Sequence, residues 1–206
     1  MCIRDSINTG VANIRSLQAA FDRLGEAWQL TENAADIETA SHVVLPGVGA
    51  FAAAVESIDR LGLRETIIER INTPQLATLS ICLGMQLLGN NSEECGTSVG
   101  LGVIPHSIKR FGNDVKVPQL GWNVVDPQTE GPYQTGEAYF ANSFRLVEPP
   151  EGWGYAHTDY GGRFISSIWR GRMLACQFHP ELSVQWGQQV LQNWIAGVTV
   201  ANESQS

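Results

Sequence analysis

Two patterns of apolar residues alternate along the first half of the chain. Apolar residues at helical spacing predict helices, and short continuous apolar runs between them predict buried strands. Strands that alternate with helices are typical of a parallel sheet covered on both faces, which is a doubly wound α/β fold. The predicted helices span residues 13–24, which Gly25 would end, 51–61 and 64–72, and the predicted strands span 42–45 and 76–81.

After about residue 102 the pattern changes to short apolar runs separated by Gly, Pro and Asp. Such runs favour antiparallel or mixed strands, and a final helix is predicted at 183–195. We therefore expect a mostly parallel central sheet flanked by helices, with additional antiparallel strands in the second half. The runs lie at 107–111, 122–125, 137–144, 164–169 and 173–178.

The length of 206 residues suits a single domain spanning 1–206, in which the segment 199–206 is expected to fray as a tail. Hydrophobic residues make up 43% and charged residues 17% of the chain, which excludes a disordered protein. The net charge of −8 and the pI near 4.9 argue against nucleic acid or an anionic membrane as the main partner. No apolar stretch approaches the roughly 18 residues of a membrane span.

The cysteines are Cys2, Cys82, Cys95 and Cys176, and they have neither the spacing of zinc ligands nor a disulfide-framework pattern. This usage fits a reducing compartment, so a cytoplasmic protein is expected. Cys95 and Cys176 are interpreted as structural or incidental thiols.

Cys82 lies in the sequence SICLG at 80–84, directly after the predicted strand and directly before a helix-like apolar run. A sharp strand-to-helix turn of this kind holds a nucleophile above a sheet edge, and small flanking residues avoid collisions in it. Ser80 stands where such a turn usually has its first glycine. A thiol at a helix N-terminus also feels the positive end of the helix dipole, which favours the thiolate. For this pattern alone, a buried structural cysteine is the alternative.

A histidine and a glutamate occur later in the chain, in the sequence QFHPE. The apolar run 173–175 predicts a strand that ends at His179, because Pro180 cannot continue it. A triad then makes Cys82 the nucleophile and His179 the general base and later acid, while Glu181 orients the imidazole and favours its protonated form. For the HPE tripeptide alone, a surface histidine beside a solvated glutamate is the alternative.

The pairing of SICLGMQLL with QFHPE resembles the class I, triad-type glutamine amidotransferases. Within that family, residues from about 8 to 195 are similar to the glutaminase subunits of imidazole glycerol phosphate synthase. The resemblance implies a Cys–His–Glu glutaminase with a thioester intermediate and no metal or organic cofactor. The further motifs that carry it are LPGVGAF at 45–51, PQLGWN at 118–123, YFANSF at 139–144 and DYGG at 159–162.

The resemblance also implies which groups surround the substrate. Attack of Cys82 on the side-chain amide of glutamine makes an oxyanion, which the backbone N–H groups of Val48 and Leu83 would stabilise. Val48 lies in the loop PGVG, whose glycines would let its peptide turn into place only in the active state; a plain tight turn is the alternative. Asn142 stands where relatives often have histidine. The implied glutamine-binding residues are Gly47, Gln86, Glu94 (for the ammonium), Asn142, and Ser143 and Phe144, whose backbone would hold the carboxylate.

Ammonia released at the thiol would be lost to solvent unless it passed to a second site, so a partner is expected. In the family that partner is a (β/α)8-barrel cyclase docked over the glutaminase site, which implies a heterodimer. Trp122 and Tyr139 have the amphipathic bulk of interface anchors, and core packing is their alternative. Leu182 stands where relatives commonly carry a basic residue. The implied docking residues are Asn13, Arg15, Trp122, Tyr139 and Leu182.

Together these features predict a glutaminase subunit that channels ammonia to a cyclase making imidazole glycerol phosphate in histidine biosynthesis. Another triad glutaminase, serving pyridoxal phosphate, anthranilate or GMP synthesis, is the alternative among enzymes. A catalytically silent module that only docks to a barrel partner is the alternative from another class, and the intact triad residues count against it.

The N-terminus departs from the family pattern. The first strand of such a sheet is normally central, buried and nearly continuous in apolar residues. Here it should end near residues 7–10, yet Arg4, Asp5 and Ser6 stand where aliphatic residues are expected, and a buried ion pair is generally costly. Residues 1–6 are therefore expected to be a non-native start. The alternative is a shortened strand whose charged residues lie beyond the end of the sheet.

Overall fold

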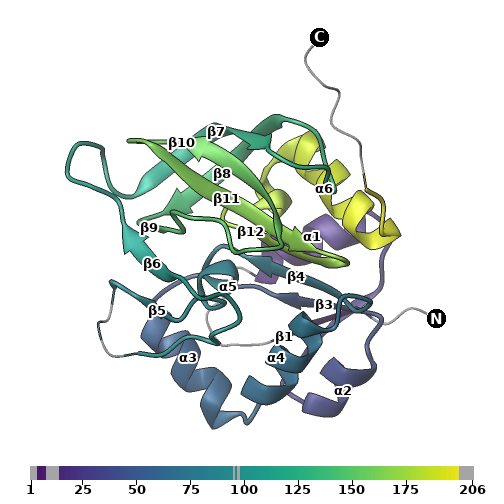
Figure 1. Ribbon diagram of the computed structural model, residues 1–206. Helices are drawn as coiled ribbons and strands as arrows, with labels where there is room; N and C mark the ends of the chain where they lie inside the picture. Colours follow the sequence, from purple (N-terminus) through teal and green to yellow (C-terminus); the bar gives the residue numbers. More distant parts are fainter. Residues whose placement is uncertain (1–3, 8–13, 95, 97, 200–206) are drawn as a thin grey trace.

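A mixed sheet of nine strands forms the centre of the computed structural model, which describes residues 4–7, 14–94, 96 and 98–199 (Figure 1). Its strands follow one another in space in an order that differs from the order of the sequence. From one edge to the other they are β2 (Trp28–Thr31), β1 (Arg4–Ile7), β3 (His42–Leu45), β4 (Ala77–Ile81), β12 (Met173–Cys176), β11 (Arg163–Arg170), β10 (Gly154–Asp159), β7 (Gln119–Pro127) and β8 (Gly136–Asn142).

The five strands from β2 to β12 are parallel, and every pair from β12 to β8 is antiparallel. The change falls at β12, where Cys176 pairs with Ile81 of β4 on one side and with Ser167 of β11 on the other. This arrangement confirms the predicted parallel first half and antiparallel second half. Ligands of parallel sheets bind beyond the carboxyl ends of the strands. Here the carboxyl end of β4 lies beside that of β12, the strand that joins the parallel half to the antiparallel half.

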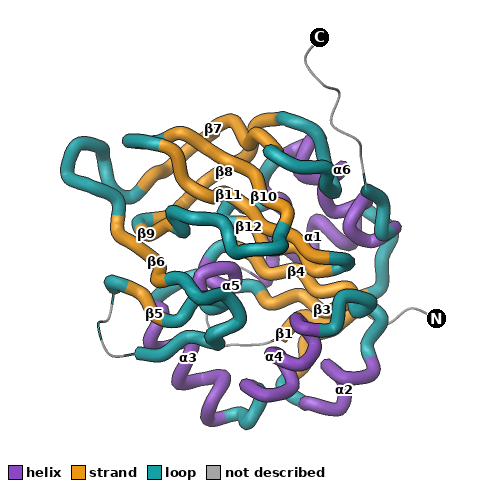
Figure 2. The backbone as a smooth tube through the Cα atoms, viewed as in Figure 1, coloured by secondary structure: helices purple, strands orange, loops and turns teal. Residues whose placement is uncertain are grey.

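Helices cover both faces of the parallel strands, as a doubly wound fold requires (Figures 1 and 2). Each face has its own apolar core: Leu45, Phe51 and Ile58 belong to one, and Leu17 and Leu191 to the other. The helices of the first face are α2 (Ala34–Thr39), α3 (Phe51–Arg60) and α4 (Arg64–Asn72), and those of the second are α1 (Ile14–Arg23) and α6 (Val184–Ala196).

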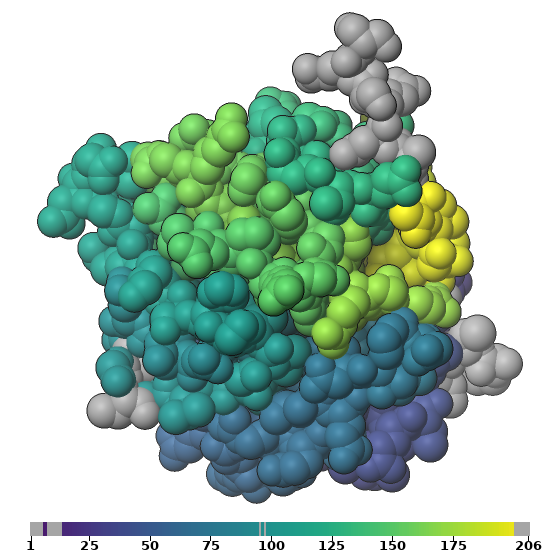
Figure 3. Space-filling view, in the orientation of Figure 1, coloured from purple at the N-terminus to yellow at the C-terminus, as the bar shows by residue number. Residues whose placement is uncertain are grey.

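A second, three-stranded sheet consists of β5 (Asn91–Ser92), β6 (Ser107–Arg110) and β9 (Phe144–Arg145). The space-filling view shows the teal and green second half of the chain stacked directly on the blue first half (Figure 3). Within the described residues, no helix combines the length and the apolar character needed to cross a lipid bilayer.

The N-terminal strand is paired on both sides despite its polar sequence. In β1, Arg4 pairs with Trp28 of β2 and with His42 of β3, so the alternative of charged residues beyond the sheet end is wrong for the backbone. Ser6 is buried, and its Oγ has no hydrogen-bond partner among the residues that the structure describes. Residues 1–3, and the expected tail except for Thr199, lie outside the described residues.

The predicted end of the strand at His179 is wrong, because the strand ends earlier. β12 stops at Cys176. The N–H of Gln177 still donates to the carbonyl of Ser166 of β11 over 2.8 Å, in register with the pairs before it. The N–H of His179 instead donates to the carbonyl of Tyr139 of β8 over 2.9 Å. The chain therefore crosses from the centre of the sheet toward β8, and a short 3-10 helix, η1 (Pro180–Leu182), follows.

Candidate active site

Cys82 lies in a strained turn between β4 and α5 (Leu83–Gln86), with φ 52° and ψ −107°. Non-glycine residues rarely adopt a positive φ, and such strain is concentrated at functional sites. The N–H of Cys82 donates to the carbonyl of Cys176 over 2.7 Å, which fixes the turn on the end of β12. A Cβ added to Gly84 would lie 2.0 Å from the carbonyl oxygen of Leu45. The predicted need for small residues around the nucleophile therefore holds at Gly84, while Ser80 is accommodated and fully buried.

The helix that follows the nucleophile is shorter than the apolar run suggests. α5 has four residues and ends at Gln86. A helix dipole is the sum of aligned peptide dipoles, so a single turn contributes little of it. Stabilisation of a thiolate at Cys82 therefore depends on side-chain donors more than on the predicted dipole.

His179 and Glu181 meet in the predicted pairing. The Nδ1 atom of His179 lies 2.8 Å from Oε1 of Glu181, and both side chains are almost completely buried. The Oγ of Ser183 donates to the carbonyl of His179 over 2.6 Å and holds the backbone of this segment. The carboxylate is placed to orient the imidazole so that its other nitrogen serves the nucleophile.

The protonated form of His179 is favoured by its neighbours. Burial alone lowers the pKa of this imidazole, but hydrogen bonds to Cys82 and Glu181, together with the charges of both groups, raise it from 6.5 to about 11. The imidazolium of His179 therefore lies between the sulfur of Cys82 and the carboxylate of Glu181. It places a proton donor directly beside the nucleophile.

A cavity of about 290 Å³ opens beside Cys82 and His179. Its size suits a small ligand, and its lining joins the end of the parallel half to β8 and the loop after it. Most predicted substrate residues line it; Gly47 lies behind it, in a small adjoining space with His179 and Glu181. The predicted residues that line the cavity are Val48, Leu83, Gln86, Glu94, Asn142, Ser143 and Phe144.

The polar groups of this cavity are already oriented. Asn142 donates through Nδ2 to the carbonyl of Phe144 over 3.0 Å, and its buried Oδ1 has no partner among the described residues. Glu94 accepts through Oε2 from the N–H of Phe51 over 3.0 Å. One carboxylate oxygen of Glu94 is thus engaged by the first residue of α3, and the residue lines the cavity where a ligand ammonium could approach it.

The two predicted oxyanion donors do not both face the thiol. The N–H of Leu83 donates to the carbonyl of Gly47 over 3.3 Å. Both N–H groups could face an oxyanion only after the peptide between Gly47 and Val48 had turned. This is the rearrangement that the glycines of PGVG would permit, and the oxyanion hole stays a prediction.

Gln177 is a site residue that the sequence interpretation missed. Its side chain is buried, and its Nε2 donates to the Sγ of Cys82 over 3.6 Å. Gln86 donates through Nε2 to Oε1 of Gln177 over 2.9 Å. The sequence contains a signal for this contact. Gln177 and His179 are two residues apart, and in extended backbone the side chains of residues two apart point to the same face.

Of the predicted docking residues, Tyr139 is joined directly to the triad segment, because its carbonyl accepts from the N–H of His179. Trp122 is 49% exposed, so the alternative of core packing is wrong for it, and its ring contacts that of half-buried Tyr139 edge to face at 6.0 Å. Leu182 is half-buried and Arg15 is exposed, whereas Asn13 lies outside the described residues.

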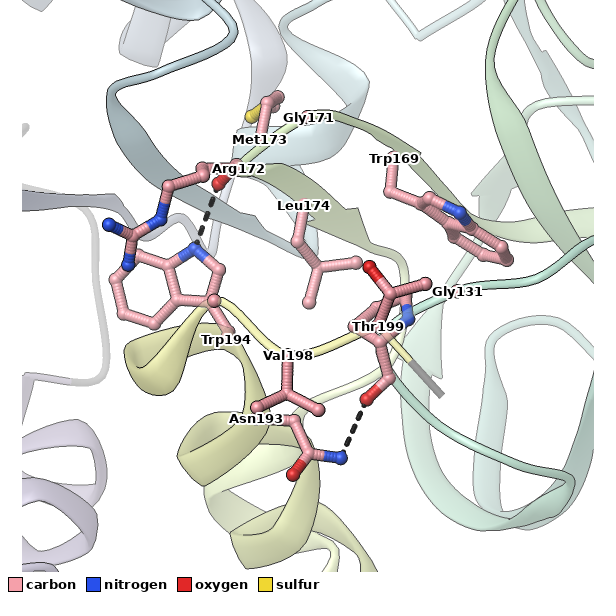
Figure 4. A pocket seen from close by; sticks show the side chains of 12 residues that line it. Gly131, Trp169, Gly171, Arg172, Met173, Leu174, Asn193, Trp194, Val198 and Thr199 are labelled. Atoms are coloured by element: carbon pink, nitrogen blue, oxygen red, sulfur yellow. Dashed lines mark hydrogen bonds between the residues drawn. The ribbon is translucent and has the colours of Figure 1, made fainter. Parts of the chain in front are cut away.

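A second, smaller cavity of about 40 Å³ lies between α6 and the amino end of β12, away from Cys82 (Figure 4). Trp194 donates through Nε1 to the carbonyl of Arg172 over 3.2 Å at its rim. Its lining residues include no thiol, carboxylate or imidazole, so it offers none of the groups that a triad needs.

The chain is similar to known proteins over most of its length. The family model for class-I glutamine amidotransferases matches residues 6–197. Imidazole glycerol phosphate synthase subunit HisH of Syntrophotalea carbinolica is 37% identical over 200 residues, covering 91% of this chain and 97% of the relative. The subunit of the same name from Chlorobium luteolum is 41% identical over 193 residues, covering 90% and 95%. A crystal structure of a glutamine amidotransferase superposes with a TM-score of 0.75 at 16% identity, covering 94% and 97% of the two chains.

Proposed function

The chain belongs to the class-I glutamine amidotransferase family, and we propose that it is the glutaminase subunit of an imidazole glycerol phosphate synthase. In this role it hydrolyses glutamine to glutamate and ammonia and passes the ammonia to a cyclase partner in histidine biosynthesis. The observation that carries the proposal is the strained elbow at Cys82 beside the buried pair of His179 and Glu181. Relatives at 37% and 41% identity bear the name of this subunit, which favours it over the glutaminases of other pathways.

In the first half of the reaction, the thiolate of Cys82 attacks the side-chain amide carbon of glutamine and forms a tetrahedral oxyanion. His179 is an imidazolium at this point and gives its proton to the amide nitrogen. The C–N bond then breaks, ammonia leaves, and a γ-glutamyl thioester remains on Cys82. Glu181 stays ionised and holds the Nδ1–H of His179 throughout.

In the second half, a water molecule attacks the thioester carbon. The neutral imidazole of His179 takes a proton from that water, and collapse of the second tetrahedral intermediate breaks the C–S bond. Glutamate leaves, and the thiolate of Cys82 and the imidazolium are restored together. The backbone N–H groups of Val48 and Leu83 would stabilise both oxyanions once the Gly47 peptide has turned.

The partner that receives the ammonia is proposed to be a (β/α)8-barrel cyclase bound over the site. The alternate residues Leu120, Trp122 and Val124 of β7 are 63%, 49% and 45% exposed, which is an apolar strip on one face of an edge region of the sheet. Trp122 pairs with Tyr139 of β8, whose carbonyl accepts from the N–H of His179. A partner bound on this strip would therefore contact the residues that hold the catalytic histidine.

The cytoplasm is the proposed compartment. Both described cysteines, Cys82 and Cys176, are free thiols, and the mechanism requires the first of them to stay reduced. A reducing compartment keeps them so.

Cys82→Ala tests the proposed function. With the cyclase partner and its nucleotide substrate present, this variant should lose glutamine-dependent synthesis by at least about 10⁴-fold, as removal of a triad nucleophile does. Added ammonium salts should still support synthesis, because free ammonia bypasses the triad. Cys176→Ala is the matched control, since it removes the other described thiol and should keep glutaminase activity. Glutamate production by Cys82→Ala at the wild-type rate would refute the assignment.

A further inference from the structure

A chain of side-chain amides connects the wall of the substrate cavity to the nucleophile. Gln86, which lines the cavity, donates through Nε2 to the carbonyl of Phe144 over 3.2 Å and to Oε1 of Gln177 over 2.9 Å. Gln177 in turn donates through Nε2 to Sγ of Cys82 over 3.6 Å. Gln177 is 1% exposed, so water does not compete for these bonds.

The orientation of both side-chain amides follows from the one group in this network that can only accept a hydrogen bond. The backbone carbonyl of Phe144 can only accept, so Gln86 must present its nitrogen to it. The same nitrogen also faces Gln177, which must therefore present its oxygen. The remaining end of the Gln177 amide is its NH₂ group, and that group faces the sulfur of Cys82. The amide orientation at the nucleophile is thus determined by the hydrogen-bond network.

We propose that Gln177 is a further catalytic residue, whose side-chain N–H holds the Cys82 sulfur in place and stabilises its thiolate form. This role rests on the proposed function, since it serves the same nucleophile. The physical reason is that a buried anion needs donors, and the single-turn helix α5 supplies little dipole. His179 is one donor, on the side where it must exchange protons with the substrate, and Gln177 is a second donor that never exchanges a proton.

The contact acts at two points of the reaction. A hydrogen bond to a charged acceptor is about twice as strong as one to a neutral acceptor, so the N–H of Gln177 favours thiolate sulfur over thioester sulfur. Before the first attack it holds the sulfur in position beside the cavity. In the second half it stabilises the thiolate that leaves as the C–S bond breaks. Because Gln177 does not line the substrate cavity, its loss should change kcat more than KM.

The test is the pH dependence of Cys82 alkylation by iodoacetamide in the full-length protein, followed by mass spectrometry of the peptide that contains Cys82. Gln177→Met keeps the length of the side chain and removes the donor. Gln177→Glu keeps its shape and its acceptor toward Gln86, but replaces the donor by an oxygen. Gln189→Met is the matched control, because Gln189 is exposed on α6 and donates through Nε2 to Oδ1 of Asn193, one helical turn away.

In Gln177→Met, the pH of half-maximal alkylation should rise by about one unit, which is roughly a tenfold slower reaction below the midpoint. Gln177→Glu should raise it further, and Gln189→Met should leave it unchanged. Circular dichroism melting establishes that each variant is folded; if Gln177→Met is not, the isosteric Gln177→Glu decides. Alkylation profiles of the Gln177 variants that superpose on the wild-type profile would overturn the proposal.

The outcome separates this proposal from the function on which it rests. Alkylation needs no substrate or partner, so a shifted profile in a protein that never hydrolyses glutamine would keep Gln177 as a thiolate donor and reject the glutaminase. Full glutaminase activity with unchanged kcat in Gln177→Met would keep the glutaminase function and reject Gln177 as a catalytic residue.

Discussion

Replacement of Gly84 by alanine should damage both the stability and the site of this protein. Gly84 is the second residue after the nucleophile, and its α-carbon faces the end of β3. A Cβ there would lie 2.0 Å from the carbonyl oxygen and 3.1 Å from the carbonyl carbon of Leu45. Ordinary contacts of a Cβ begin at 3.4 Å, so the elbow and the end of β3 would have to separate by more than an ångström.

The cost can be estimated from the kind of atom that is met. Leu45 is fully buried and its carbonyl belongs to a paired central strand, so the neighbour cannot rotate away. Overpacking of this kind typically costs 1–3 kcal/mol, and a backbone neighbour favours the upper end, about 3 kcal/mol. For a chain of this size that corresponds to a fall in Tm of roughly 6–12 °C. Because Gly47 follows Leu45 closely, the displacement would also move the oxyanion loop, and a misplacement of about 1 Å can cost about a hundredfold in rate.

Urea unfolding and glutaminase assays with the partner would measure the two effects of Gly84→Ala. Gly112→Ala is the matched control: its added Cβ would lie 2.4 Å from Oδ1 of Asp114, which is the end of an exposed side chain that can rotate away. The control should stay within about 0.5 kcal/mol of the wild-type free energy of unfolding. If Gly84→Ala and Gly112→Ala unfold at the same urea concentration, the steric argument about the elbow is wrong.

Three further outcomes are expected. Because the N–H of Leu83 donates to Gly47, the isolated chain should hydrolyse glutamine far more slowly than the complex with its partner, and equal rates of glutamate production would contradict a closed loop. The pKa of His179 is raised from 6.5 to about 11 on folding, so its contribution to stability is complete below pH 6.5 and is lost as the pH rises toward 11. In His179→Gln the free energy of unfolding, measured with urea, should therefore fall less steeply between these pH values than in the wild type. Equal slopes of this free energy against pH in the two proteins would contradict the argument. Replacing residues 4–6 by Val-Ile-Ile should raise Tm, since the buried hydroxyl of Ser6 has no hydrogen-bond partner among the described residues, and an unchanged or lower Tm would show that the polar strand is tolerated.

The elements that the sequence predicted correctly are those whose own pattern is strong. α3 and α4 carry apolar residues at helical spacing over 10 and 9 residues, and β3 and β4 are buried at every position. The local sequence alone therefore predicts each of these elements. The predictions missed β2, which is an edge strand with two exposed residues among its four. They also missed α2, which has only six residues and begins at the side-chain cap of Asn33. Short helices and edge strands gain their stability from tertiary contacts that local propensity does not contain.

The end of β12 shows the same limit at the site. Pro180 was a sound reason for a strand to stop, but the strand ends earlier, at Cys176. The deciding contact is the hydrogen bond from the N–H of His179 to the carbonyl of Tyr139, which comes from a distant part of the sequence. Whether a backbone N–H continues one ladder or bonds to another strand depends on the whole fold.

The missed role of Gln177 had a simpler cause, because the motif was interpreted only through its ionisable residues. In extended backbone, residues two apart share a face, so the side chains of Gln177 and His179 should point the same way and Phe178 the opposite way. The structure agrees: Phe178 is fully buried in the apolar core, while Gln177 contacts the sulfur of Cys82 and His179 is adjacent to it. One pentapeptide thus supplies a proton-exchanging donor, a fixed donor and the carboxylate that orients the histidine. A triad assigned only from ionisable side chains leaves out the neutral amide of Gln177. A base removes the proton from a thiol, but the buried thiolate that results also needs hydrogen-bond donors.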